Sequence, residues 1–257
     1  MRRGVTRPVR LLGLLLAAGL ALAAQPAMAQ PPAPATDPRQ IYSSESPDWL
    51  RAVGKLQVPG HKYQDGRRAH HREDCSATLV ARPSSTRADT IVTAWHCLEF
   101  YRDLSKPIVF TLLPGSRDSI ASEAYRLADG GGMHADWAIL RLYDAVPVSS
   151  VNPMTIHPEQ ADPGRPIIMA GYSRDRAVGN NGDHLSYDPD CAITHQSQRS
   201  SDSNCTAHKG SSGGAVTQVS PAGDPRICGV ISQGNGVGLS TFVPINGFRH
   251  ALTQHLR

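Results

Sequence analysis

Short β-prone runs separated by turn-forming residues are the feature that most limits what this 257-residue chain can fold into. Glycine, proline, aspartate or asparagine stands between one run and the next, which is the pattern of a sandwich or a barrel. Helical periodicity is confined to the end, at 245–256, where apolar and polar residues alternate at helical spacing. The sequence therefore predicts an all-β fold that closes with a helix. The expected strands are Ala52–Val58, Ser76–Ala81, Thr90–Ala94, Ile108–Leu113, Trp137–Leu142, Ile167–Ala170, Ala215–Val219, Ile227–Ser232 and Leu239–Val243.

The first 29 residues have the pattern of a secretory signal peptide. Four arginines within the first ten residues precede the apolar run Leu11–Ala24, and Ala27–Ala29 offers a small-residue cleavage site. The apolar run is short for a membrane span, so an uncleaved anchor is disfavoured. We expect residues 30–51, which begin with a proline-rich stretch, to form a linker or propeptide, and residues 52–257 to form the folded domain.

The basic excess of the chain resides in this leader. The chain has 26 Lys and Arg against 22 Asp and Glu, and the leader holds four Arg and no acidic residue. Without the leader the protein is formally neutral, so its charge indicates neither a nucleic-acid nor a membrane partner. We expect a monomer without a cofactor.

Five cysteines in an exported chain predict disulfides and one unpaired cysteine. Several pairings are possible. We expect Cys75–Cys97 and Cys191–Cys205, because each pair closes a local loop next to one of the motifs described below. Cys228 lies in an apolar run typical of a buried strand, so we expect a free and unreactive thiol. Disulfides are compatible with both the periplasm and the external medium, and the final compartment stays open between them.

A histidine directly follows one of the predicted strands. Residues 93–97 read Thr-Ala-Trp-His-Cys, and Cys97 could hold the neighbouring His96 in place. A neutral imidazole can take a proton from a hydroxyl and return it to a leaving group. His96 is therefore a candidate general base, although a lone histidine among the 11 of this chain would more often be structural or exposed.

A serine between glycines precedes the predicted strand Ala215–Val219. Residues 210–214 read Gly-Ser-Ser-Gly-Gly, and glycine permits backbone conformations that other residues resist. The N–H groups of Gly210 and Ser212 could then converge on a developing oxyanion, with Ser212 as the nucleophile. A simple glycine-rich turn is the alternative, since such strings also occur in linkers.

An aspartate stands where the predicted strand Trp137–Leu142 begins. A carboxylate at the start of so apolar a strand costs free energy unless it has a partner. His96 is the candidate partner, and Asp136 would then orient its imidazole. The alternative is a turn aspartate that caps the loop Gly130–Gly132.

The order His, Asp, Ser, with the motifs Thr-Ala-Trp-His-Cys, Asp-Trp-Ala-Ile-Leu and Gly-Ser-Ser-Gly-Gly, resembles that of the trypsin-like (chymotrypsin-fold) serine endopeptidases. The likeness is greatest to the secreted bacterial branch that includes glutamyl-endopeptidase-like enzymes, and it extends over residues 52–256. It implies two six-stranded antiparallel β-barrels with the active site between them and a C-terminal helix. It further implies that His96 is the general base, Asp136 its orienting group and Ser212 the nucleophile of an acyl-enzyme mechanism.

The same resemblance assigns a role to the strand near residue 232. It also reveals one difference between this chain and the animal enzymes. Ser232 matches the serine that contacts the buried aspartate, and Ser232–Gly234 would pair with the substrate backbone as an added strand. The animal enzymes carry an aspartate just before the nucleophile, where it pairs with a freshly cut N-terminus. Ser211 stands there in this chain, so we expect that activation switch to be missing.

The substrate preference is left open by the sequence. Thr206 stands where relatives that cleave after Arg or Lys carry an acid, and Lys209 could favour an acidic side chain. Glutamate-cleaving relatives place a histidine just before the serine equivalent to Ser232, whereas this chain has Ile231. The candidate substrate-binding residues are Thr206, Lys209, Ser232 and Gly234, and the substrate is a polypeptide.

Parts of the sequence also fit two functions other than that of a protease. Gly210–Gly214 also fits the nucleophile elbow of α/β-hydrolases, with Asp224 and His250 following in the required order. Only 45 residues follow Ser212, however, which is too few for the remaining strands and crossover helices of that fold. A non-catalytic binding protein on the trypsin-like fold is the second alternative, but such relatives normally lose a triad member, and here all three candidates are present.

A ligand-rich stretch, His70–Cys75 with His61 nearby, raises the possibility of a metal site. Adjacent histidines on an extended segment point to opposite faces, so His70 and His71 cannot easily share one ion. We therefore expect a polar loop before the Cys75 strand and no metal site, with a surface calcium site as the alternative.

Overall fold

The structure is a computed structural model that describes residue 1, residues 37–102 and residues 105–257. Residues 2–29 of the expected signal peptide and residues 30–36 of the expected linker lie outside the described residues. The described chain forms an all-β fold with one short C-terminal α-helix. None of the helices in these ranges is long and apolar enough to cross a membrane.

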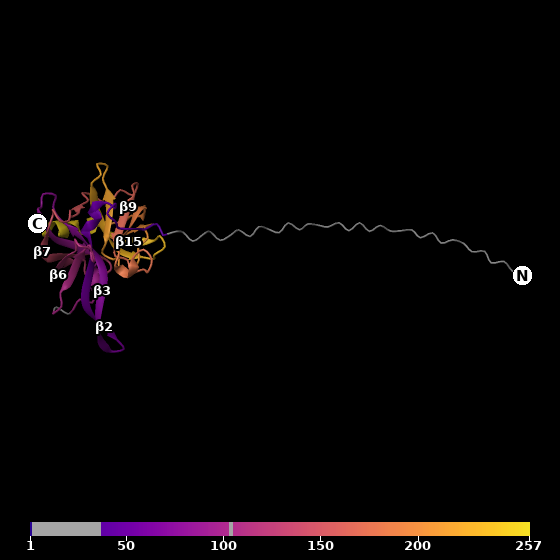
Figure 1. Ribbon diagram of the computed structural model, residues 1–257, viewed down its shortest axis with the longest axis horizontal. Coiled ribbons are helices and arrows are strands. Elements are labelled where there is room, and N and C mark those ends of the chain that lie inside the picture. The colour runs from indigo at the N-terminus through magenta and orange to yellow at the C-terminus, as the bar shows by residue number, and fades with distance from the viewer. Residues whose placement is uncertain (2–36, 103–104) are drawn as a thin grey trace. The chain divides into compact units, whose positions relative to one another are not determined.

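Six strands of the N-terminal half close into a barrel, in the order β2-β3-β4-β7-β6-β5. Four of them, β2, β3, β6 and β7, are labelled in Figure 1. Alternate side chains along each strand point inward, and Leu56, Ile91 and Leu140 in the barrel core are fully buried. The closed barrel leaves no unpaired sheet edge. The strands are β2 (Val53–Gln64), β3 (Arg67–Val80), β4 (Arg87–Thr93), β5 (Ile108–Leu112), β6 (Ile120–Asp129) and β7 (Ala138–Pro147).

The second half is a curled sheet of nine strands, in the order β1-β10-β9-β13-β14-β15-β12-β11 with β8 beside β14. The expected all-β fold with a C-terminal helix is thus confirmed, and the second of the two expected barrels is present as a curled half-barrel sheet rather than a closed barrel. Strands β11 and β12 have three residues each, and the register of their pairing shifts between Ile193 and His195. Few backbone groups are therefore left at this edge to pair with a further strand. The strands are β1 (Gln40–Ile41), β8 (Thr155–Ile156), β9 (Ile167–Gly171), β10 (Ser186–Cys191), β11 (Ile193–His195), β12 (Ser201–Ser203), β13 (Ala215–Val219), β14 (Pro225–Gly234) and β15 (Ser240–Pro244).

All nine strands expected from the sequence occur. Ala215–Val219 has the expected ends and the other eight have shifted ends, whereas β1, β6, β8, β10, β11 and β12 were not expected. β6 escaped notice because its buried residues, Ser122 and Ala124, are small, and polar or aromatic residues are exposed between and after them, so no run of large apolar residues marks the strand. The expected helix at 245–256 is present as a 3₁₀ turn, η4 (Ile245–Gly247), followed by the helix α1 (Arg249–His255).

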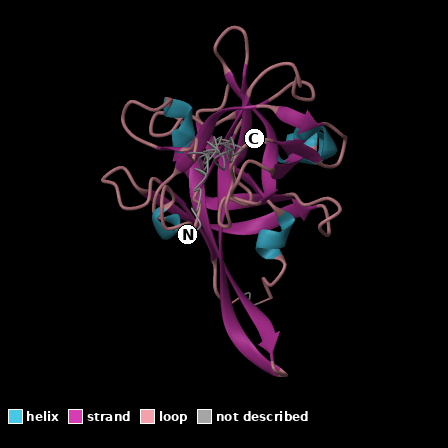
Figure 2. Cartoon of the chain, turned by 90° about the vertical axis from the view of Figure 1, so that its right-hand side faces the viewer, coloured by secondary structure: helices cyan, strands magenta, loops and turns pink. Residues whose placement is uncertain are grey.

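Strands β2 and β3 form a long hairpin that projects beyond the barrel (Figure 2). They pair without a break from Val53 and Thr78 to Gln64 and Arg67. Asp65 and Gly66 at the tip both have positive φ, as a two-residue turn of this kind requires. The stretch His70–Cys75 is thus part of a strand, and the expected polar loop there is wrong.

Residues 37–51, which the sequence placed in a linker or propeptide, pack on the domain. They belong to one compact unit, Asp37–Arg257. β1 pairs with β10, and the 3₁₀ turn η1 (Asp48–Ala52) buries Leu50 completely.

Two disulfides are present, Cys75–Cys97 and Cys191–Cys205, which are the pairs expected from the sequence. Cys228 on β14 is free and buried, and burial raises the pKa of its thiol to about 12. This thiol therefore stays protonated at neutral pH.

Candidate active site

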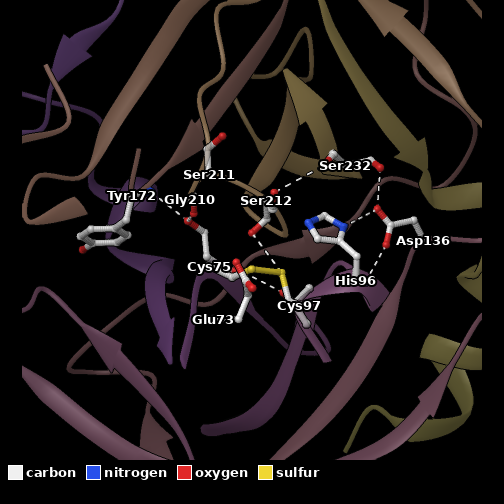
Figure 3. Close-up of a disulfide and its surroundings, with 12 residues drawn as sticks. Glu73, Cys75, His96, Cys97, Asp136, Tyr172, Gly210, Ser211, Ser212 and Ser232 are labelled. Atoms are coloured by element: carbon white, nitrogen blue, oxygen red, sulfur yellow. Dashed lines mark hydrogen bonds and ion pairs between the residues drawn. A yellow bond between two sulfur atoms is a disulfide. The ribbon is translucent and has the colours of Figure 1, made fainter. Parts of the chain in front are cut away.

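His96 lies in the 3₁₀ turn η2 (Trp95–Leu98) directly after β4, at the end of the barrel. Its neighbours Cys97 and Leu98 are buried, and the disulfide ties Cys97 to β3, so the turn is anchored from both sides. The His96 Nδ1 atom lies 2.9 Å from Asp136 Oδ2, and the His96 backbone N–H donates to Asp136 Oδ1 over 2.8 Å (Figure 3). The carboxylate therefore holds both the ring and the backbone of the histidine.

Asp136 precedes β7 and is 1% exposed. Burial by itself raises the pKa of a carboxyl group, but the hydrogen bonds and charge interaction with His96, together with a hydrogen bond from Ser232, outweigh burial and lower the pKa of Asp136. The Ser232 hydroxyl donates to Asp136 Oδ2 over 2.5 Å. The buried carboxylate is thus ionised and oriented toward the imidazole.

Ser212 occupies a tight turn before β13. The Gly213 N–H donates to the Ile231 carbonyl over 2.7 Å, and the Gly214 N–H donates to the Ser211 carbonyl over 2.8 Å. The imidazole of His96 lies between Ser212 and Asp136 (Figure 3). The Ser212 hydroxyl donates to the Ser232 carbonyl over 3.4 Å, and no hydrogen bond joins it to His96 in the described structure. Such a bond often forms only when substrate is bound.

The N–H groups of Gly210 and Ser212 donate to no protein acceptor within the described parts of the chain. Both groups lie on the turn that carries the candidate nucleophile. They are therefore available to an oxygen that gains negative charge beside Ser212.

Ser76 on β3 supports this turn, and the sequence analysis missed it. It is fully buried, and its hydroxyl donates to the Gly210 carbonyl over 2.9 Å while accepting the Tyr172 N–H over 2.8 Å. Its backbone N–H donates to the Ser212 carbonyl over 2.8 Å. No local motif marks this serine, because its partners come from distant segments.

A cavity of about 340 Å³ opens at these groups. Five of the residues that line it were not expected from the sequence as site residues, namely Met133, His208, Ser211, Ile231 and Gln233. Thr206 does not line it: this residue is buried, and its N–H donates to Asp188 over 2.8 Å. The expected site residues that line the cavity are His96, Lys209, Ser212, Ser232 and Gly234.

A larger cavity, of about 500 Å³, lies beside the β2–β3 hairpin, against His70, His71 and Arg72. It contains none of the candidate catalytic residues, so we place the site in the smaller cavity. The described residues bring three potential metal ligands together only at Cys75, His96 and Cys97, and both sulfurs there are in a disulfide.

Comparisons with known proteins agree with this architecture. Residues 75–220 match the family described as the trypsin-like peptidase domain. The solved structure of a thermostable serine protease from an extremophilic microorganism is similar, with a TM-score of 0.59 and 19% identity, and the match covers 81% of this chain and 100% of that one. At this identity the structural match shows the chymotrypsin-like fold alone. No curated protein matches the sequence.

Proposed function

Because the chain belongs to the trypsin-like peptidase family, we propose that it is a secreted serine endopeptidase with Ser212 as nucleophile, His96 as general base and Asp136 as the orienting group. The observation that carries this proposal is the buried Asp136 carboxylate, which holds the His96 ring at the cavity that also receives Ser212.

The reaction begins when Ser212 Oγ turns from the Ser232 carbonyl toward His96 Nε2 and attacks the peptide carbonyl carbon. The hydroxyl proton passes to His96, and the N–H groups of Gly210 and Ser212 stabilise the oxyanion. The imidazolium then gives its proton to the leaving nitrogen as the C–N bond breaks, which leaves an acyl-enzyme. Water hydrolyses this ester with His96 again acting as base, and Ser212 regains its proton.

A hydrolysis assay on an unfolded protein substrate tests the proposal. His96→Ala and Ser212→Ala are each expected to lower kcat by about a thousandfold or more without loss of the folded state. His250→Ala is the matched control: His250 is exposed on α1, and it is the base that an α/β-hydrolase mechanism would need. Wild-type hydrolysis by Ser212→Ala would contradict the proposal, and loss of activity in His250→Ala would favour the hydrolase alternative.

We infer that the gap between Ala207 and residues 234–236, near Ser212, is narrow and leaves little room for the substrate side chain that precedes the cut. The Gly236 N–H donates to the Ala207 carbonyl over 3.0 Å, and a Cβ placed on Gly234 would lie 2.2 Å from the Ala207 oxygen. A substrate paired with Ser232–Gly234 directs its side chain into this gap. We therefore propose a preference for glycine, alanine or serine before the cut, to be measured with a peptide library.

Among the described residues, no oppositely charged group lies deep in the gap to pair with a charged substrate side chain before the cut. Asp188 is only 3% exposed beneath Thr206, and burial raises its pKa. Lys209 is exposed at the cavity wall, where its charge favours acidic groups elsewhere in the substrate. Membership of the glutamyl-endopeptidase-like branch is therefore supported by the sequence motifs and not by the pocket.

Secretion is part of the proposal and is supported by the signal-peptide pattern and the two disulfides. N-terminal sequencing of the exported protein tests it, with cleavage after Ala29 expected.

A further inference from the structure

A buried ion pair joins the N-terminal segment 37–41 to the loop 173–182. The side chain of Arg39 is 2% exposed, which is unusual for a charged group. Its guanidinium lies 2.6 Å from Asp37 Oδ2 and 2.8 Å from Asp175 Oδ1. The adjoining strand β1 pairs with β10, which holds the segment in place. Arg39 is thus fixed on two sides and aimed at the loop.

The loop 173–182 is folded around the carboxylate that Arg39 contacts. The Gly179 N–H donates to Asp175 Oδ2 over 3.1 Å, and the Asn181 N–H donates to the Asp175 carbonyl over 2.8 Å. Loss of the guanidinium would leave this largely buried carboxylate without its ion-pair partner, which favours rearrangement of the loop.

The same loop touches the oxyanion segment directly. The Arg174 N–H donates to the Lys209 carbonyl over 2.7 Å, immediately before Gly210. Gly210 has φ +99°, and a Cβ there would lie 2.6 Å from the Tyr172 carbonyl oxygen. The peptide between Lys209 and Gly210 supplies one of the two free N–H groups, so its orientation depends on Arg174.

We propose that Arg39 is a positioning residue for the oxyanion hole, acting through Asp175 and Arg174, and that residues 37–41 are a permanent part of the working enzyme. This inference rests on the proposed protease function. The cation is a side chain within the chain, so no newly cut N-terminus is needed to place it. Removal of residues 1–51 would therefore abolish activity rather than release it.

The test compares Arg39→Gln and Asp175→Asn with the matched control Arg141→Gln in the mature protein. Arg141 is a similarly buried arginine, 6% exposed, that pairs with Asp89 and the carbonyl of His255 at the C-terminal helix. All variants are assayed for kcat and KM on one peptide and for the thermal unfolding midpoint. The oxyanion hole acts in the transition state, so Arg39→Gln and Asp175→Asn are expected to lower kcat by about 10- to 100-fold with little change in KM.

Arg141→Gln is expected to lower the thermal unfolding midpoint about as much as Arg39→Gln does. Its kcat should stay near the parent value. Arg39→Lys, which keeps a cation but not the planar fork, should recover part of the lost kcat. If Arg39→Gln does not fold, the kcat of Asp175→Asn tests the inference instead. This variant should fold, because its amide oxygen can still accept the Gly179 N–H.

The outcomes separate the inference from the function on which it rests. A folded parent without hydrolytic activity would overturn the protease function and this inference with it. An active parent whose Arg39→Gln and Asp175→Asn variants keep the parent kcat would overturn the inference alone. An equal kcat loss in Arg141→Gln would also overturn it, because the effect would then follow from stability.

Discussion

The backbone N–H of Ser76 donates to the carbonyl of Ser212 over 2.8 Å, and this bond joins the closed barrel to the turn that carries the candidate nucleophile. The Ser76 side chain reinforces the link through Gly210 and Tyr172. Ser76 follows Cys75, whose disulfide partner Cys97 is adjacent to His96. One short stretch of β3 therefore sets the position of both the base and the nucleophile.

Ser76→Ala is expected to lower the free energy of unfolding by about 1–3 kcal/mol, because the buried Gly210 carbonyl and Tyr172 N–H each lose a hydrogen-bond partner. A drop in kcat should accompany it, since Gly210 carries an oxyanion donor. Urea unfolding and steady-state kinetics measure the two effects, with the exposed Ser116→Ala as control. A variant as stable and as active as the parent would contradict this role for Ser76.

Acid destabilisation is expected to depend on Asp175. Burial opposes ionisation of this carboxyl, but hydrogen bonds from Arg39 and Gly179 and the charges of Arg39 and His208 lower its pKa to about 2. Its folded pKa is below the ordinary carboxyl value near 4, so its contribution to stability is complete above about pH 4 and is lost as the pH falls toward about 2. Thermal melts between pH 6 and pH 2 should show a shallower loss in Asp175→Asn than in the parent, and parallel curves would refute the assignment.

The rate of peptide hydrolysis is expected to fall in acid. A protonated His96 cannot accept the Ser212 proton, whereas Asp136, with its lowered pKa, stays ionised over the same range. A profile of kcat/KM against pH should therefore show a single-proton decline on the acid side. A rate that is constant from acid to neutral pH would exclude an imidazole base.

Cys228 is expected to resist thiol reagents in the folded protein. It is fully buried, and burial raises its pKa to about 12, so almost no thiolate is present at neutral pH. Counting thiols with a colorimetric reagent should give none in the native state and one after unfolding without reductant. More than one thiol in the unfolded protein would mean that a disulfide is missing.

The sequence predicted the strands that are short apolar, β-prone runs, and it singled out His96, Asp136 and Ser212 because each stands at the end of such a run or in a glycine turn. It could not predict that the second sheet stays open, since closure depends on whether distant strand ends pair. Residues 37–51 were assigned to a linker because prolines dominate the stretch before them, yet Arg39 finds its partner 136 residues away. Ser76 escaped notice for the same reason: its contacts are all long-range, and no local motif records them.

Labelling of the mature protein with a fluorophosphonate probe, followed by peptide mapping, shows whether Ser212 is the activated nucleophile. A base-activated serine beside an oxyanion site reacts with such a probe, whereas an ordinary serine does not. We expect one label per molecule, carried by Ser212, and none in Ser212→Ala. A folded protein that takes no label, or that carries it on another serine, would contradict the assignment of Ser212 as the nucleophile.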